Sequence, residues 1–341
     1  MRMLSRTKDR ARSPVNLRPK ALLFGGLLIM SASCTTSTES PAADPSDGPT
    51  GQIVYVKSGL DDTQTYFIAN ADGSGERQLT QPGDYCCLAR ISPDRSQLLV
   101  MPGGTLSPPI TGGMLSIDGS GFEQLKLTDP TLNLVPQAWS PDGERIAFEG
   151  WDDSDPYRTG VYTARASDLG DLVRVTDSGG RPHDSPLDYS PDGTQLVFYR
   201  SARAEPHFPI DIGGSLWVVN LDGSNPHRLK TPGVTPGWFA RWSPDGTKIL
   251  FATERLQPTG ALWTISPDGT GLTKVFEDEE GLFATGPTWS PDGRQIMFTL
   301  NPTNDSFVHD PNGLYVIDAH GSAPSLVIGG PGFTSSPEWW A

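Results

Sequence analysis

A motif of the form WSPDGxxIxF recurs along this chain of 341 residues. Its serine falls at positions 92, 140, 190, 243 and 290, so successive copies lie 48, 50, 53 and 47 residues apart. The copies read RISPDRSQLLV (90–100), AWSPDGERIAF (138–148), DYSPDGTQLVF (188–198), RWSPDGTKILF (241–251) and TWSPDGRQIMF (288–298). A repeat of this length fits one four-stranded blade of a β-propeller.

A second motif lies between the copies of the first. Each example has an alternating apolar run, a turn and a short strand, which is the pattern of a hairpin. Its six copies are YFIANADGSGERQLT (66–80), MLSIDGSGFEQLKLT (114–128), VYTARASDLGDLVRVT (161–176), LWVVNLDGSNPHRLK (216–230), LWTISPDGTGLTKVF (262–276) and LYVIDAHGSAPSLVI (314–328). Six copies predict six blades.

The first motif is also present in two halves at opposite ends of the repeat region. PEWWA (337–341) matches its front half, and GQIVYV (51–56) matches its back half. We therefore expect an all-β, six-bladed propeller over 51–341, closed by pairing the C-terminal strand with the N-terminal blade. A β-sandwich with regular turns would not explain why the repeat is cut at complementary points. Closure would also remove an open sheet edge.

Residues 1–33 read as an export signal. Seven basic residues between positions 2 and 20 precede an apolar run of ten residues, 21–30, which is too short for a membrane-spanning helix of about 20 residues. Small residues ending at Cys34 resemble a bacterial lipobox, although Ser31 stands where leucine is usual. The resemblance implies a lipoprotein signal peptide (1–33), a lipidated Cys34 and a flexible tether (34–50). Simple secretion is the alternative.

The composition is acidic. The formal net charge is −14, and loss of residues 1–33, with seven basic residues and one acidic residue, would lower it to −20. So negative a chain argues against binding nucleic acid or anionic lipid headgroups, because both repel carboxylates. Basic partners and cations remain compatible, and an acidic surface kept for solubility explains the charge equally well.

Beyond Cys34 the chain has two cysteines, Cys86 and Cys87, which are adjacent. In an exported protein they could form a vicinal disulfide, stay as thiols or bind a soft metal. No set of Cys and His at metal-ligand spacing accompanies them.

The strand order of a propeller blade decides which loops share an end. If the four strands are A to D from the inside outward, the A–B and C–D turns lie at one end, here called the SPDG end. The B–C and D–A loops lie at the other end. We call it the variable end, because the copies of the repeat diverge most in these loops. Divergent loops on a rigid scaffold usually carry function. We therefore place the binding surface at the variable end, around the channel mouth.

The residues before the signature aromatic of strand A are expected to lie nearest the channel. They form a mixed ring of Arg90, Ala138, Asp188, Arg241, Thr288 and Glu338. Arg90, Asp188, Arg241 and Glu338 are candidates for holding a charged peptide end, with ion pairing between blades as the alternative. Trp238 and Phe239, in a D–A connection, are candidate anchors for a partner, and covering the core is their alternative role.

Enzymatic motifs are scarce. His183, His207 and His309 fall in variable-end loops, where three converging imidazoles could bind a divalent metal. The sequence has no GxSxG nucleophile elbow, P-loop or HExxH motif. The Asp of each SPDG is a turn residue repeated by the architecture, and we expect no cofactor.

The combination of WSPDGxxIxF, LWVVNLDGS and RLT-type strands resembles the WD40-like (PD40) repeats of the TolB family of periplasmic propellers, over residues 51–341. The resemblance implies a propeller, export and binding of proteins or peptides at the channel mouth, and it carries over no catalytic residue. TolB proteins have a small α/β domain ahead of the propeller, whereas only the tether precedes it here, so their partner set is not implied. Similar repeats form the propellers of tricorn and prolyl-oligopeptidase-type peptidases, where a separate hydrolase domain performs catalysis.

We therefore expect a monomeric extracytoplasmic propeller, exported and lipid-anchored to the cell membrane, that holds a protein or peptide partner in the cell envelope. It would touch the membrane through its lipid alone and bind no nucleic acid. The alternative is a metal-dependent propeller hydrolase or lyase that acts on a lactone or glycan at the channel mouth.

Overall fold

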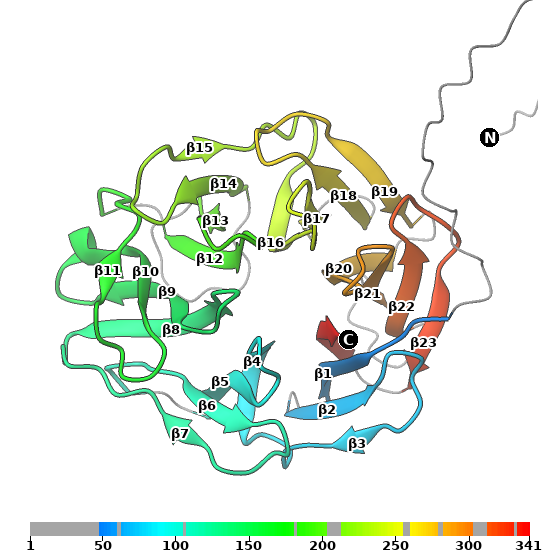
Figure 1. Ribbon diagram of the computed structural model, residues 1–341, viewed down its shortest axis with the longest axis horizontal. Helices are drawn as coiled ribbons and strands as arrows, with labels where there is room; N and C mark the ends of the chain where they lie inside the picture. Colours follow the sequence, from blue (N-terminus) through cyan, green and yellow to red (C-terminus); the bar gives the residue numbers. More distant parts are fainter. Residues whose placement is uncertain are drawn as a thin grey trace, which may run out of the picture. The chain divides into compact units, whose positions relative to one another are not determined.

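The fold is a ring of six four-stranded antiparallel sheets around a central channel (Figure 1). This computed structural model describes residues 48–59, 63–104, 107–180, 183–202, 213–254, 260–278, 282–302, 312–330 and 333–341. The predicted six-bladed propeller is confirmed. Cys34 and the rest of the proposed leader and tether up to residue 47 lie outside the described residues.

The blades are numbered along the chain, and the strands of each are given from the inside outward. Blades 1 and 2 contain β24 (Phe333–Trp340), β1 (Gln52–Ser58), β2 (Gln64–Asn70) and β3 (Arg77–Gln78), then β4 (Tyr85–Ile91), β5 (Gln97–Pro102), β6 (Gly113–Ser116) and β7 (Glu123–Gln124). Blades 3 and 4 contain β8 (Leu132–Trp139), β9 (Arg145–Asp152), β10 (Gly160–Arg165) and β11 (Val173–Arg174), then β12 (Asp184–Tyr189), β13 (Gln195–Arg200), β14 (Ser215–Asn220) and β15 (His227–Arg228). Blades 5 and 6 contain β16 (Pro236–Trp242), β17 (Ile249–Thr253), β18 (Ala261–Ile265) and β19 (Thr273–Glu277), then β20 (Leu282–Trp289), β21 (Gln295–Pro302), β22 (Gly313–Asp318) and β23 (Ser325–Gly329). A 3-10 helix, η1 (Pro156–Arg158), lies between β9 and β10.

The ring closes through blade 1 as the split motif predicted. Strand β24 pairs antiparallel with β1, in the register Gln52↔Trp340 and Ile53↔Trp339. The indole Nε1 of Trp339 also donates to the carbonyl of Thr50, at 2.7 Å. Both ends of the repeat region are thereby held in one sheet.

Each SPDG motif is a self-contained turn. In blade 4, the Ser190 hydroxyl donates to Asp192 Oδ1 at 2.6 Å and accepts from the backbone N–H of Gln195 at 2.9 Å. Asp192 Oδ1 also accepts from the backbone N–H of Thr194, and Gly193 has a φ of 70°, which glycine adopts without strain. The aspartate is therefore the turn residue that the repeat predicted.

The signature aromatics pack between blades. The described residues form six hydrophobic clusters, each shared by two neighbouring blades. Five of them contain or contact a signature aromatic: Trp139, Tyr189, Trp242, Trp289 and Trp339. In the sixth, between blades 1 and 2, the signature position is Ile91, and Trp340 supplies the aromatic. A buried aromatic of this size removes a large apolar area from water. The repeated aromatic therefore joins each blade to its neighbour.

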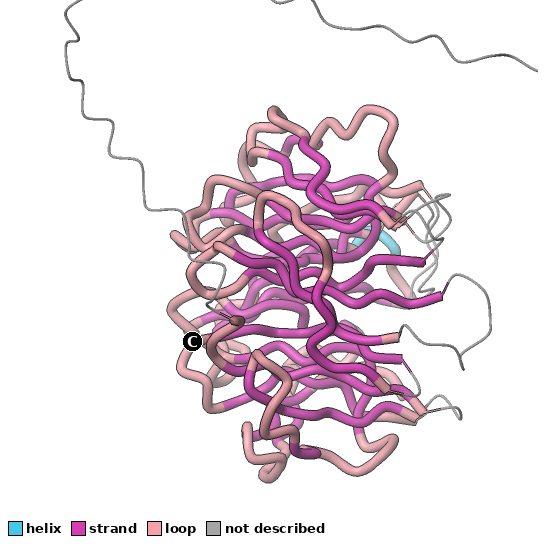
Figure 2. The backbone as a smooth tube through the Cα atoms, turned by 90° about the vertical axis from the view of Figure 1, so that its right-hand side faces the viewer, coloured by secondary structure: helices cyan, strands magenta, loops and turns pink. Residues whose placement is uncertain are grey.

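The two ends of the ring are distinguished by the C-terminus. Figure 2 shows the ring from the side, with the C-terminus at one end. In blade 1, β24 is strand A and β1 is strand B, and Trp340 near the end of β24 pairs with Gln52 at the start of β1. The end of strand A and the start of strand B lie at the SPDG end in every blade, so the C-terminus marks the SPDG end. Residues 203–212, 255–259 and 303–311 of the variable end lie outside the described part of the chain.

Candidate functional site

The six residues that precede the signature aromatics converge on the central channel. They line a cavity of about 230 Å³ there: Arg90, Ala138, Asp188, Arg241, Thr288 and Glu338. In every blade a register shift in the innermost pair of strands comes before this residue. Bulges re-aim the side chains that follow them. The ring is thus a product of six bulges that the sequence motif did not reveal.

Glu338 is the centre of the charges in this ring. Its Oε1 accepts from Arg90 Nη1 at 2.5 Å and also from Arg241 Nη2. Both arginines make a second bond to a neighbouring blade, Arg90 to the carbonyl of Gln137 at 2.9 Å and Arg241 to that of Leu187 at 3.0 Å. The three side chains are only 6–14% exposed. These charges are therefore satisfied within the protein.

Asp188 is the fourth charged member of the ring. Its Oδ2 accepts from the backbone N–H of Trp242 at 2.9 Å. Burial raises the pKa of Asp188 to about 7, and the Glu338 carboxylate acts in the same direction. Burial likewise raises the pKa of Glu338 to about 7, against the opposing effect of the Arg90 guanidinium. The channel thus holds two carboxyl groups that take up protons more readily than exposed ones.

The position of this ring corrects the sequence interpretation. The cavity is also lined by Pro93, Pro244 and Pro291 of the SPDG turns. The ring therefore lies toward the SPDG end, because the residue before the aromatic is near the end of strand A rather than its beginning. Ion pairing between blades, the alternative reading, is what the geometry shows. Contact of these four residues with a partner stays a prediction.

His183 lies near the start of the innermost strand of blade 4, toward the variable end, and is buried. Its Nδ1 is 3.2 Å from Glu149 Oε1, and the Ser185 hydroxyl donates to Glu149 Oε2 at 2.7 Å. Glu149 thus links blades 3 and 4. His207 and His309 lie outside the described residues, so the predicted three-histidine metal site stays a prediction. Within the described ranges, no three Cys, His, Asp or Glu side chains are grouped as metal ligands.

Cys86 and Cys87 lie in β4, at the register shift of blade 2. Cys86 Sγ lies 3.8 Å from the carbonyl oxygen of Pro102. The side chain of Cys87 is outside the described part, so the predicted vicinal disulfide stays a prediction.

Trp238 and Phe239 lie in the bulge of β16, where the register passes from Pro236 directly to Ala240. Both side chains are half-buried. Trp238 packs against the cluster between blades 4 and 5, with its ring 6.1 Å from that of Tyr199. Covering the core, the alternative considered for this pair, therefore describes Trp238. Phe239 is absent from that cluster and is the better candidate for contact with a partner.

The sequence analysis missed Tyr157, the most exposed large aromatic among the described residues, at 69%. It lies on η1 in the B–C loop of blade 3, at the variable end. Asp155 caps η1 by accepting from the backbone N–H of Tyr157 at 3.0 Å, and Arg158 donates to Asp152 at 2.7 Å. The ring borders Gly180, where an added methyl would lie 3.3 Å from Tyr157 Cδ1. The sequence did carry a signal for this residue, since Tyr157 is an aromatic residue within a divergent B–C loop.

No helix in the described part of the chain is long and apolar enough to cross a membrane.

Comparison of sequences finds relatives that match part of the chain. No family model matches it. It is 29% identical over 170 residues to the uncharacterised protein Atu1656 of Agrobacterium fabrum, which covers 47% of this chain and 52% of that protein. It is 28% identical over 136 residues to the uncharacterised peptidase YuxL of Bacillus subtilis, covering 40% of this chain. The match to dipeptidyl-peptidase 5 of Porphyromonas endodontalis is 32% over 112 residues, or 33% of this chain. The chain spans only 19% and 15% of these two peptidases.

Comparison of structures covers more of the chain. TolB of Acinetobacter baumannii matches 84% of this chain with 66% of its own length, at a TM-score of 0.62 and 18% identity. A TolB homologue of Agrobacterium tumefaciens matches 84% of this chain with 92% of its own, at 0.58 and 18%. An oligogalacturonate lyase in complex with manganese matches 84% with 83%, at 0.55 and 13%. The chain therefore has the six-bladed propeller fold of the TolB structures.

Proposed function

We propose that this protein is an exported, lipid-tethered propeller that binds a protein or peptide partner at its variable end and performs no covalent chemistry. The shared fold with TolB and the resemblance of the repeats support a role in protein binding. The leader and Cys34 support export and anchoring. The two peptidases in the comparison give no reason to propose catalysis for this protein, because the propeller fold occurs in proteins with many different functions.

Tyr157 is the observation that carries the proposal. Monomeric proteins expose few large aromatics, whereas protein interfaces use them as anchors. Here the loop that presents Tyr157 is held by a cap at Asp155 and by the bonds of Arg158, so its ordering cost is already met before a partner arrives. Phe239, half-buried in the bulge of β16 on the innermost strand of blade 5, is a second candidate aromatic.

The path of the chain supports the choice of end. Thr50 is held by Trp339 at the SPDG end, so the chain enters the propeller there. The proposed partner site at the variable end therefore lies at the opposite end of the ring from this entry point.

Crosslinking mass spectrometry on the full-length protein in its native envelope tests partner binding. Tyr157→Ser and Phe239→Ser should each remove the dominant crosslinked partner. Leu326→Ser, which changes an apolar residue that is 57% exposed on the outer strand β23, is the matched control and should retain it. Retention of every partner by both test variants would overturn the proposal. Anchoring is tested separately, since Cys34→Ala should move the protein from the membrane to the soluble fraction.

A further inference from the structure

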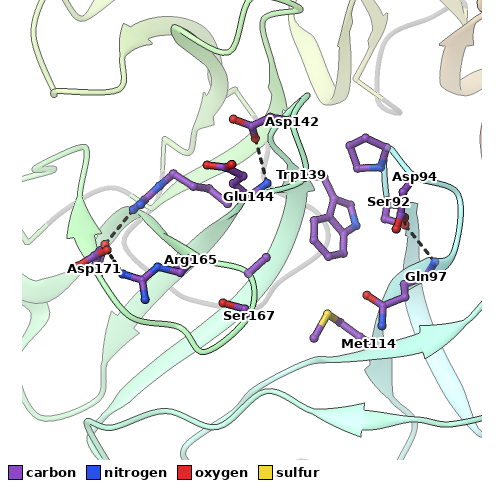
Figure 3. Close-up of a pocket in the computed structure, with 14 residues that line it drawn as sticks. Ser92, Asp94, Gln97, Met114, Trp139, Asp142, Glu144, Arg165, Ser167 and Asp171 are labelled. Atoms are coloured by element: carbon purple, nitrogen blue, oxygen red, sulfur yellow. Dashed lines mark hydrogen bonds and ion pairs between the residues drawn. The ribbon is translucent and has the colours of Figure 1, made fainter.

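A groove of about 790 Å³ separates blades 2 and 3 at the SPDG end (Figure 3). Blade 2 contributes its SPD turn and Met114, and blade 3 contributes Trp139, its SPDG turn and the loop that joins β10 to β11. All of its lining residues belong to the described part of the chain. It lies at the end opposite to Tyr157.

The groove lies beside an exception in the repeat. In blades 1, 2, 4 and 6 the glycine of the C–D turn lies against a carbonyl of the preceding blade's outer strand; a Cβ added to Gly73, Gly119, Gly223 or Gly321 would be 2.1–2.9 Å from that oxygen. Blade 3 has Asp168-Leu169-Gly170 instead of the Asp-Gly-Ser pattern. Leu169 and Asp171 adopt φ values of 55° and 51°. The blade 3 turn is closed by a bond from Arg165 N–H to the Gly170 carbonyl and is one residue longer than the blade 1 turn, which Asn70 N–H closes on the Ser74 carbonyl. Leu169 packs with Leu125 of blade 2, and a Cβ added to Gly269 in the blade 5 turn would also be as far as 3.9 Å from its carbonyl oxygen, so the groove lies beside the one turn among these that is longer and has no glycine at this position.

Trp139 and Met114 supply the apolar part of the groove. Trp139 is half-buried, whereas the four other signature aromatics, Tyr189, Trp242, Trp289 and Trp339, are buried. Its Nε1 donates to the carbonyl of Arg90 at 3.2 Å, which fixes the indole in place. One aromatic of the repeat is therefore partly exposed and held rigid.

The charges around the indole are predominantly negative. The two arginines are already engaged: Arg165 with Asp168 and Asp171, and Arg145 with the carbonyls of Thr163 and Asp171. Asp94, Asp142 and Glu144 complete the rim. Hydrogen bonds from the Ser92 and Ser140 hydroxyls lower the pKa of Asp94 and Asp142, so both stay ionised at neutral pH. Glu144 is exposed and makes no ion pair within 4.0 Å in the described part of the chain.

We propose that this groove binds a basic, extended segment of a second protein, with one arginine or lysine side chain over the Trp139 indole and its charge among Asp94, Asp142 and Glu144. An aromatic face attracts a cation, and flanking carboxylates strengthen that attraction. The groove of about 790 Å³ between blades 2 and 3 has room for an extended chain, and its acidic rim selects a basic one. The protein would then hold partners at both ends of the ring.

The proposal is tested by fluorescence anisotropy with a labelled peptide, acetyl-SGRSGRS, and its counterpart acetyl-SGESGES, using the purified full-length chain. The arginine peptide should bind and the glutamate peptide should not, and affinity should fall as salt is raised. Glu144→Lys should weaken binding of the arginine peptide about tenfold. Trp139→Leu should also weaken this binding, and at every salt concentration. Glu123→Lys, an equal charge change on the outer strand β7, should leave binding unchanged.

Two outcomes would overturn the proposal. One is equal binding of the two peptides, and the other is binding that Glu144→Lys does not weaken. Glu144 is exposed, so this variant keeps the test valid even if Trp139→Leu fails to fold. Tyr157→Ser should have no effect on the arginine peptide, which separates this groove from the proposed site at the variable end.

Discussion

Arg90 and Glu338 form an ion pair of 2.5 Å although 248 residues separate them along the chain. Arg90 belongs to blade 2 and Glu338 to the closing strand β24. Arg241 of blade 5 donates to the same carboxylate oxygen from across the channel. A single side chain on the closing strand thus connects three blades.

Glu338→Gln should destabilise the protein strongly, because it leaves two buried guanidinium groups without their counter-charge. Breaking a buried ion pair in this way costs about 3–5 kcal/mol. Urea unfolding followed by tryptophan fluorescence measures the loss. Glu277→Gln breaks the exposed pair with Lys274 and should cost less than about 1 kcal/mol. An equal loss for the two variants would contradict a structural role for the ring.

Asp188→Asn should remove a pH dependence of stability. The pKa of Asp188 is about 7 in the folded protein against 3.8 for an ordinary aspartate, so between about pH 4 and 7 the folded state keeps a proton that the unfolded state has lost. The contribution of Asp188 to wild-type stability therefore falls as pH rises through this window, by at most about 1.4 kcal/mol per pH unit, and this contribution is constant on either side. The asparagine variant still accepts from Trp242 but does not titrate. Urea midpoints of the two proteins across the window should converge at low pH and separate near pH 7; parallel curves would refute the assignment.

Deletion of residues 333–341 should prevent a stable monomer. It removes β24, exposes the edge of β1 and takes Trp339 and Trp340 out of two hydrophobic clusters. Loss of a buried tryptophan costs about 3–5 kcal/mol, and two exceed the margin of many domains. Size-exclusion chromatography and near-UV circular dichroism should show association or loss of fixed packing. Deletion of the exposed Ala341 alone should leave both unchanged.

Gly193→Ala should cost about 1 kcal/mol, because its φ of 70° is strained for a residue with a side chain. The methyl itself would meet only ordinary contact, 3.6 Å from Pro141. Arg95 has the matching turn position in blade 2, with a φ of 64°. Arg95→Gly should therefore not destabilise the protein. Thermal unfolding of the two variants tests the same turn position, once by removing a glycine and once by adding one. A lower melting temperature for Arg95→Gly would contradict this account.

The repeat carried most of the fold information. The period of 47–53 residues predicted the blades, and the halves at 51–56 and 337–341 predicted the pairing of β24 with β1. Both depend on local alternation and turn chemistry, which are visible in one sequence. The bulges are not, because a register shift depends on the partner strand. That is why the meeting of Arg90 and Arg241 on one Glu338 oxygen required the structure.

The candidate sites were less predictable for the same reason. The sequence left open whether Trp238 anchors a partner or covers the core; it packs on Tyr199, which comes from the neighbouring blade. The exposure of Tyr157 depends on how its helix, η1, lies against Gly180, which is 23 residues further along the chain. The groove beside Trp139 is lined in part by one altered turn in blade 3. The deviation was readable as Asp168-Leu169-Gly170, but its spatial consequence required the structure.

The closing strand also sets an order of events in time. As the chain emerges, blades 2 to 6 can each be completed from neighbouring residues, whereas β1, β2 and β3 appear first and lack their inner strand. Blade 1 is finished only when residues 333–340 are available. Long-range pairing of this kind is the slow part of β-sheet folding. Strands β1 to β3 are the first of the propeller to be synthesised, yet their blade is the last to be completed, and the ring stays open until its final strand arrives.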